Sequence, residues 1–408
     1  MLGESDPCLG IGETFVALAF AIEAHERGYI DSCYVQQSLR RHRSELVPIA
    51  EIAGDCAALQ ARLAHDPSID PGRAAYLASQ LAAMATRLEI MQGHRESLAA
   101  EARAFFEIEP QWIDERYFED GRVCLQDQLP GAGSIFQRLE DFRARARIPL
   151  DGSSAVLDKI VSHLRELTRQ TFAIPEGDEV SLSFRADVSS LGYHRYFGAY
   201  RSTVQINNAK PLDLLQLVHL LAHEAYAGHH TELVLKELNL TRRRGWLEHS
   251  LTLVDVPSCV ISEGIATRAL AALIAEQDLV TWCAELLTFV GVSAAEAQPR
   301  VMVEQARQRL RSVASNAALL LDEQRPADEI VCYIRERGLC DEWEARRILH
   351  FIHAARSYVF IYHAGGCLLD EVLADRADAN ADFCRLLSEP FTPRTVRKGW
   401  SVGATSLR

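Results

Sequence analysis

The chain has 408 residues, of which 48% are hydrophobic, and its 43 Lys and Arg against 56 Asp and Glu give a formal net charge of −13. This length allows two or three domains, or one large helical domain with a subdomain. The acidic balance argues against a nucleic-acid partner or an anionic membrane surface, and no apolar run approaches the roughly 20 residues that span a bilayer.

The first part of the chain reads as helices separated by turns. Residues 13–27 are helical in pattern, and Gly28 is placed to end that helix. Residues 34–66 indicate one or two more helices. Apolar residues at helical spacing over 73–106 predict one long helix, and further helices are expected over 134–146 and 154–172.

The composition changes near residue 174, where the only convincing β structure begins. Val180, Leu182 and Phe184 alternate with polar residues, as a strand does. Residues 196–207 are also rich in β-formers and predict the second strand of a hairpin-like pair. From Pro211 onward the pattern is helical nearly to the C-terminus, with breaks expected at several positions, among them Gly365-Gly366.

The segment 223–232 concentrates chemistry at the centre of this helical region. It holds three histidines and two glutamates within ten residues, between apolar helical runs. Such groups are costly to bury unless something pairs them, and a divalent metal would do so. A zinc hydrolase needs three protein ligands, an open position and a carboxylate that acts as general base.

The histidine spacing differs from the usual H-E-x-x-H helix, because residue 227 is alanine. His229 and His230 follow His223 by six and seven positions, which on an unbroken helix is roughly 240° around the axis or about 10 Å along it. Either the helix is deformed at Ala227-Gly228, where glycine makes this least costly, or the metal site is not built from this pair.

Two further residues bear on the ligand set. His219 and His223 form an i, i+4 pair without any deformation, although a buried histidine hydrogen-bonded on its helix explains His219 equally simply. A third ligand should come from a later helix. Glu263 interrupts an apolar run, where an unpaired carboxylate would be penalised, and either a metal or Arg268 would relieve it.

These segments resemble a bacterial domain-of-unknown-function family whose members are regarded as zinc peptidases. The family signature is H-E-x-Y-P-G-H-H, which is H-E-A-Y-A-G-H-H here, and the family is thought to be related to the thermolysin-like gluzincins. Matching motifs follow in the family's order over most of the chain, at residues 28–31, 196–207, 246–248, 262–266 and 356–362. The signature proline is Ala227 in this chain, and the usual partner of the strand is replaced by residues 191–195.

The resemblance implies a ligand set and a base. His223, Glu263 and one of His229 or His230 would hold one Zn²⁺, and His229 is favoured because related variants also place glycine before the second histidine. Glu224 would be the general base. The strand 196–207 would be the sheet edge along which a substrate lies.

The resemblance also implies residues around the reaction. His230 would lie behind the ligands or face the substrate, and Glu232 would orient an imidazole. Arg356 and Tyr358, together with Tyr362, would face the cleft as partners of an oxyanion or carboxylate. For Arg356 and Tyr358, ordinary helix packing is the alternative.

The expected architecture is mainly α with a small β-sheet, a zincin-like arrangement of two helical lobes around a cleft. Residues 1–172 would form an N-terminal helical region. Residues 173–408 would hold the metal site, with the small sheet in 173–210 and helices over 211–408, all in one intertwined unit. The helix 211–240 would lie between the lobes.

Three functions fit this pattern. The first is a zinc-dependent hydrolase of an amide or peptide bond in a small peptide-like substrate. The second is a non-hydrolytic iron enzyme, since two histidines and one carboxylate also ligate non-haem iron, although such an enzyme has no need of Glu224. The third is an inactive helical binding protein.

The N-terminus and the cysteines predict a location. No signal peptide is expected, because the first residues carry neither a basic nor an apolar segment. The ten cysteines are scattered without a CxxC pair, which is typical of a reduced protein without disulfides. We therefore expect a cytoplasmic protein.

Overall fold

The structure is a computed structural model that describes residues 10–35, 46–150, 155–186, 190–209, 211–374 and 376–401. It is mainly helical with small sheets, as the sequence predicts. The expectations for Cys8, for the N-terminal leader and for part of the segment 34–66 concern residues outside these ranges. No single described helix is long and apolar enough to cross a membrane, although α10 and α11, bent by 81° at their junction, pass that test together.

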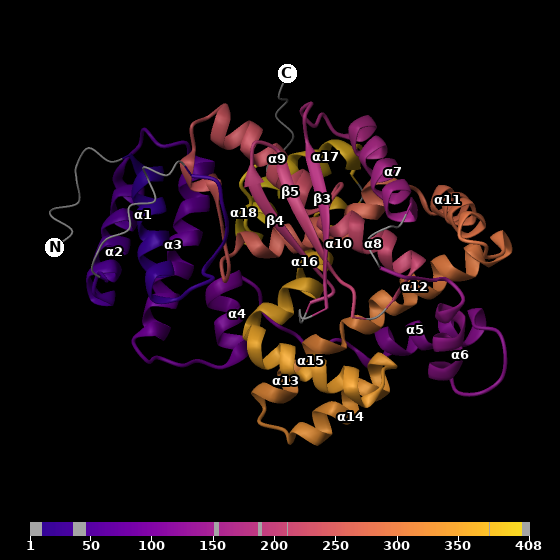
Figure 1. The fold of residues 1–408 in the computed structure, drawn as a ribbon. Coiled ribbons are helices and arrows are strands. Elements are labelled where there is room, and N and C mark those ends of the chain that lie inside the picture. Colours follow the sequence, from indigo (N-terminus) through magenta and orange to yellow (C-terminus); the bar gives the residue numbers. More distant parts are fainter. Residues whose placement is uncertain are drawn as a thin grey trace.

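The N-terminal part contributes helices that stand beside the sheet in Figure 1. The predicted helix 13–27 is confirmed as α1. The predicted helix 73–106 is instead two helices, because Ser97 accepts a hydrogen bond from the backbone N–H of Ala100 and starts a new one. The elements are α1 (Ile11–His25), β1 (Ile30–Cys33), α2 (Ile49–His65), α3 (Pro71–Met91), α4 (Leu98–Phe106), α5 (Glu115–Gln128), α6 (Ile135–Ala144), β2 (Arg147–Ile148) and α7 (Ala155–Thr171).

The main sheet has three strands in the order β3-β5-β4, with β3 parallel and β4 antiparallel to β5. The expected single strand 196–207 is wrong. It is a hairpin, because Ala199 and Tyr200 both adopt positive φ, as a type I′ turn requires. The outer strand is therefore β4, and β5 is paired on both sides. The strands are β3 (Glu179–Arg185), β4 (Gly192–Gly198), β5 (Arg201–Asn207) and β6 (Leu212–Asp213).

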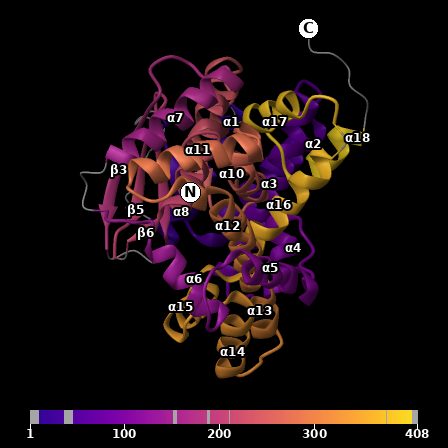
Figure 2. The ribbon, with the colours of Figure 1, turned by 90° about the vertical axis from the view of Figure 1, so that its right-hand side faces the viewer.

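Helices carrying the site lie inward of this sheet (Figure 2). The predicted helix 211–240 is broken into α8, α9 and a π-helix, and β7 pairs with β1 from the other end of the chain. The predicted division at residue 172 stays a prediction. The elements are α8 (Leu214–Glu224), α9 (His229–Lys236), η2 (Glu237–Arg242), η3 (Leu247–Ser250), β7 (Leu251–Leu253), α10 (Ser258–Leu273) and α11 (Glu276–Phe289).

The C-terminal helices close the structure around α10. The break expected at Gly365-Gly366 is absent, because these glycines lie inside α16, which packs on α10. An added Cβ at Gly264 would lie 2.6 Å from the carbonyl oxygen of Gly365, so only glycine permits this approach. The elements are η4 (Ala294–Glu296), α12 (Ala297–Arg311), α13 (Val313–Asp322), α14 (Ala327–Gly338), α15 (Glu342–Ala355), η5 (Arg356–Val359), α16 (Phe360–Leu373), α17 (Ala379–Ser388) and α18 (Pro393–Ser401).

Candidate metal centre

The chain turns sharply between α8 and α9, at the position where the sequence predicts a deformation. Ala227 has φ 71°, and its N–H donates to Oγ1 of Thr231 at 2.8 Å. An added Cβ at Gly228 would lie 1.8 Å from the carbonyl oxygen of His223, so no side chain fits there. Residue 228 must therefore be glycine, even though its φ of −91° is ordinary, because the two helix ends approach so closely.

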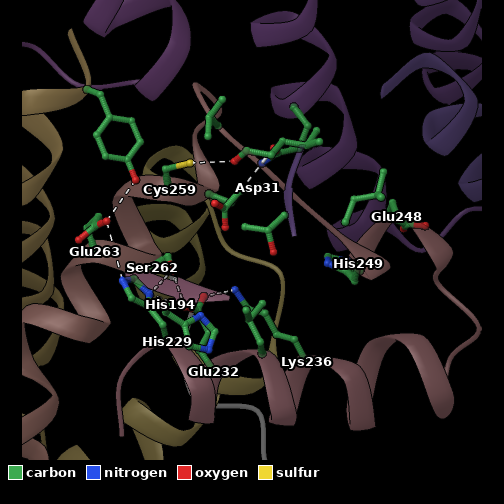
Figure 3. Close-up of a pocket in the computed structure, with 18 of the residues that line it drawn as sticks. Asp31, His194, His229, Glu232, Lys236, Glu248, His249, Cys259, Ser262 and Glu263 are labelled. Carbon is green, nitrogen blue, oxygen red and sulfur yellow. Dashed lines mark hydrogen bonds and ion pairs between the residues drawn. The ribbon is translucent and has the colours of Figure 1, made fainter. Parts of the chain in front are cut away.

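This turn brings His223 and His229 together. Their ring centroids are 4.9 Å apart, with the ring planes nearly perpendicular. Both imidazoles reach Glu263 on α10: Nε2 of His223 lies 3.4 Å from Oε2, and Nε2 of His229 lies 3.9 Å from Oε1. The structure thus brings together the three residues that the sequence analysis names as ligands, from α8, α9 and α10 (Figure 3).

The Glu263 side chain is buried and held on one side only. The Tyr358 hydroxyl donates to Oε1 at 3.1 Å, while Oε2 is buried without a hydrogen-bond partner among the described residues. An unpaired buried carboxylate oxygen facing two imidazoles is costly. These residues fit a zinc ion, because tetrahedral ligand atoms at about 2.0–2.2 Å from the metal lie about 3.4 Å from one another.

A hydrogen-bonded chain orients His229 from behind. Nδ1 of His229 lies 3.1 Å from Oγ of Ser262, which donates to Oε2 of Glu232, and Lys236 donates to the other oxygen of that carboxylate. Nε2 of His229 is therefore left to face Glu263. Outer-shell carboxylates of this kind fix the tautomer and orientation of metal-binding imidazoles, which is the role predicted for Glu232.

Glu224 is the second carboxylate at the centre. One ligand atom from each of His223, Glu224 and His229 lies within 4.8 Å of the others, so Glu224 is also within reach of a metal. Burial raises the pKa of the Glu224 carboxyl. Burial also opposes ionisation of Glu263, but hydrogen bonding and charge from His223 and His229 outweigh it and lower that pKa. A pair of carboxyls pushed apart in this way separates a proton acceptor from a permanent anion, so we assign Glu263 as the ligand.

The structure does not support the catalytic contacts predicted for His230 and Arg356. His230 is 1% exposed and points away from the cavity, with Nδ1 at 2.7 Å from Oγ of Ser202 and Nε2 at 3.8 Å from Asp178. Arg356 forms an ion pair with Glu101, at 2.6 Å, and does not line the cavity. Its motif position predicted the neighbourhood but not the direction of the side chain.

His219 and Tyr358 have different outcomes. Nδ1 of His219 lies 2.7 Å from the amide nitrogen of Gln308 on α12, so the simple buried-histidine interpretation describes it and the i, i+4 ligand pair does not. Tyr358 does line the cavity, through its contact with Glu263, and so does Tyr362.

Three cavity residues were not predicted as site residues. Asp31 on β1 accepts a hydrogen bond from the Tyr193 hydroxyl at 2.7 Å, and His194 on β4 has its ring centroid 6.0 Å from that of His229. All three line the cavity. The only sequence signal was indirect, since Tyr193 and His194 lie in the segment that departs from the family pattern.

The cavity containing this centre has a volume of about 230 Å³. Typical ligand pockets measure about 300–1,000 Å³, so this one suits a small substrate. Its walls come from α1, α3, β1 and β4 as well as from the helices that carry the ligands. Both parts of the chain therefore shape the space around the metal centre.

No protein-family model matches the chain, and no curated protein matches it either. Among solved structures it is similar to "the putative lipoprotein from Colwellia psychrerythraea", with a TM-score of 0.55 and 14% identity over 86% of this chain and 66% of that one. A second match is "a putative lipoprotein of unknown function from Shewanella oneidensis", with a TM-score of 0.49 and 10% identity over 87% of this chain and 73% of that one.

These comparisons bear on the fold and on one earlier expectation. At 14% identity the likeness to the Colwellia protein shows a shared fold alone. The cytoplasmic location predicted from the sequence is contradicted by the printed titles, because a lipoprotein is anchored to a membrane by its lipid. Lipid attachment is a property of those proteins as titled, and the cytoplasmic location is not retained for this chain.

Proposed function

We propose that this protein is a zinc-dependent hydrolase that cleaves an amide or peptide bond in a small peptide-like substrate. The observation that carries the proposal is the convergence of His223, His229 and Glu263, with a second carboxylate, Glu224, beside them in a cavity. The H-E-A-Y-A-G-H-H segment and the family it resembles support the same chemistry.

The side chains divide the work. When bound, zinc supplies a Lewis acid that polarises the substrate carbonyl and lowers the pKa of a coordinated water. Glu224 accepts the proton of the attacking water and passes it to the leaving nitrogen, a role that its raised pKa favours. Tyr358 holds Glu263 in place, and Glu232 and Ser262 hold His229.

The arrangement agrees with a zincin-like architecture, which belongs to the same proposal. The helix that carries His223 and Glu224 runs beside β4, the outer strand of the sheet. The contact is so close that an added Cβ at Gly192 would lie 2.9 Å from Oε1 of Glu224. The first residues of β4 therefore border the reacting groups.

The test compares Glu224→Gln with the wild type, after zinc loading, on a panel of short acylated peptides. We expect the variant to keep one zinc per chain and to lose at least about 100-fold in kcat, the lower end of what a general base contributes. Glu119→Gln is the matched control, because Glu119 is exposed on α5. Turnover by Glu224→Gln at near the wild-type rate would refute the role given to Glu224.

Metal analysis of protein purified without added metal tests the ion itself. We expect zinc at one per chain, and loss of zinc in His223→Ala and His229→Ala. Iron at one per chain, together with oxygen uptake, would replace the hydrolase with the oxygenase alternative. Failure to bind any divalent metal would favour the helical binding protein.

A further inference from the structure

The cavity extends past the metal centre into a second compartment. We call it the distal chamber and define it by Tyr76, Gln80, Lys236, His249 and Ser258, all of which line the same cavity as the ligands. In Figure 3, Lys236 lies between His229 on one side and His249 on the other. Tyr76 and Gln80 are one turn apart on α3 and so share one face of that helix.

Two buried polar groups in the distal chamber have an unused hydrogen-bonding atom. Nε2 of Gln80 and Nε2 of His249 are buried without a hydrogen-bond partner among the described residues, and the residues are 1% and 6% exposed. Oε1 of Gln80 already accepts from Ser258, so the free end of this amide is its donor. The His249 ring stacks against Tyr76, with the ring centroids 4.9 Å apart, which fixes its plane.

The charges around the distal chamber favour an anion. Its two carboxylates are already neutralised, Glu232 by Lys236 and Glu248 by a two-point contact from Arg73 at 2.6 and 2.7 Å. Burial lowers the pKa of His249, and the neighbouring cations Lys236, Arg73 and Arg244 lower it further. The imidazole is therefore neutral and lies among cations.

Asp31, Glu224 and Glu263 are the other carboxylates of the cavity, and they belong to its metal end. Asp31 is bonded to Tyr193, and Glu263 to Tyr358. A substrate that spans the cavity therefore meets carboxylates at the metal centre and donors at the distal chamber. Buried donors left without an acceptor are unfavourable, and a carboxylate is an acceptor that can serve several of them at once.

We propose that the distal chamber binds the carboxylate of the substrate, which accepts hydrogen bonds from Gln80 and His249 and is attracted by the charge of Lys236. This inference rests on the proposed hydrolase function and names its substrate class. With the scissile amide at the metal centre and the carboxylate in the distal chamber, the substrate is a short peptide or acylated amino acid with a free C-terminus, cut close to that end. The small volume of the cavity agrees with such a substrate.

The test measures binding rather than turnover. N-acetyl-dialanine as the free acid and as its C-terminal amide are titrated by calorimetry into the zinc-loaded Glu224→Gln protein. We expect the acid to bind at least about tenfold more tightly, as hydrogen bonds to a charged group allow. Gln80→Leu and His249→Phe, each added to this background, should remove most of that preference; phenylalanine keeps the stacking on Tyr76.

Gln92→Leu is the matched control, since Gln92 is exposed at the end of the same helix α3. It should leave the acid-to-amide ratio unchanged. Equal affinity for the two probes, no binding of either at millimolar concentration, or an acid preference that survives both Gln80→Leu and His249→Phe would each overturn the proposal. The last result would mean that the acid binds the metal instead.

The binding measurement separates this inference from the proposed function. If the wild type hydrolyses no peptide in the panel but the acid preference is present and depends on Gln80, the hydrolase proposal fails and the carboxylate site stands. If hydrolysis is observed with no preference for the free acid, the hydrolase stands and the carboxylate site fails.

Discussion

Gly228→Ala should separate the two imidazoles of the metal centre. The added Cβ would lie 1.8 Å from the carbonyl oxygen of His223 and 2.4 Å from that of Ala222, whereas real Cβ contacts are essentially never shorter than 3.0 Å. Both obstacles are backbone atoms, so no side-chain rotation relieves the clash. The ends of α8 and α9 must therefore move apart by about 1.2 Å.

This movement acts directly on metal binding, because His223 precedes the turn and His229 follows it. Ligand distances in metal sites are held within about 0.2 Å, so a displacement near 1 Å breaks the ligand set. We expect zinc affinity to fall at least about 100-fold, the upper end of what changes in the outer shell cost. Overpacking should also lower the free energy of unfolding by about 1–3 kcal/mol.

Zinc affinity is measured by competition with a chromophoric chelator, and stability by urea unfolding followed by circular dichroism. The matched control is Gly54→Ala, which makes the same change inside α2, where nothing lies within 4 Å of the added Cβ. The control should keep full zinc affinity and gain up to about 1 kcal/mol from helix propensity. A folded Gly228→Ala protein with wild-type zinc affinity would refute the geometry on which the metal centre depends.

Three further predictions concern other parts of the molecule. Tyr358→Phe should lower zinc affinity about tenfold, since it removes the hydroxyl that orients Glu263 and keeps the ring, and an unchanged affinity would remove Tyr358 from the site. His219→Gln should keep one zinc per chain by metal analysis, because His219 contacts Gln308, and loss of zinc would restore the rejected ligand pair. Burial raises the pKa of Asp255 to about 6 despite its ion pair with Arg87. Because the folded pKa is the higher one, protonation of Asp255 stabilises the fold fully below its unfolded value of about 3.8, and this contribution is lost as pH rises through 6. The difference in unfolding free energy between wild type and Asp255→Asn should therefore change by up to about 3 kcal/mol across that window, and pH profiles that run parallel would contradict the assignment.

The sequence predicted the parts of the site that rest on local chemistry. A glycine between two histidines at an unsuitable helical spacing indicates a deformation, and a glutamate inside an apolar run indicates a buried partner. Both signals lie within a few residues, and the structure contains both features. The helical class followed in the same way from the spacing of apolar residues.

The errors arose where the outcome depends on contacts distant in the sequence. Nothing near Arg356 reveals Glu101, its partner about 250 residues earlier in the chain, so the motif position suggested a substrate contact instead. The Gly365-Gly366 pair suggests a break until its packing partner Gly264 is known. The hairpin turn at Ala199-Tyr200 lacks the Asn-Gly or Asp-Gly signal that usually marks one, so one long strand was expected.

The charge balance of the cavity explains why a cation suits this centre. Lys236 neutralises Glu232, which leaves Glu224 and Glu263 facing two imidazoles without a cationic side chain bonded to either among the described residues. Burial opposes the charged form of His229, but Glu232, Glu263 and Glu224 outweigh it and raise its pKa to about 9. The centre therefore attracts positive charge strongly enough to overcome burial of the ring. A proton on one imidazole meets this demand only in part, because it neutralises one carboxylate and ties up a ligand nitrogen. A divalent cation meets it fully, since it offsets both carboxylates and uses both nitrogens, and this is the physical reason for placing a metal where α8, α9 and α10 meet.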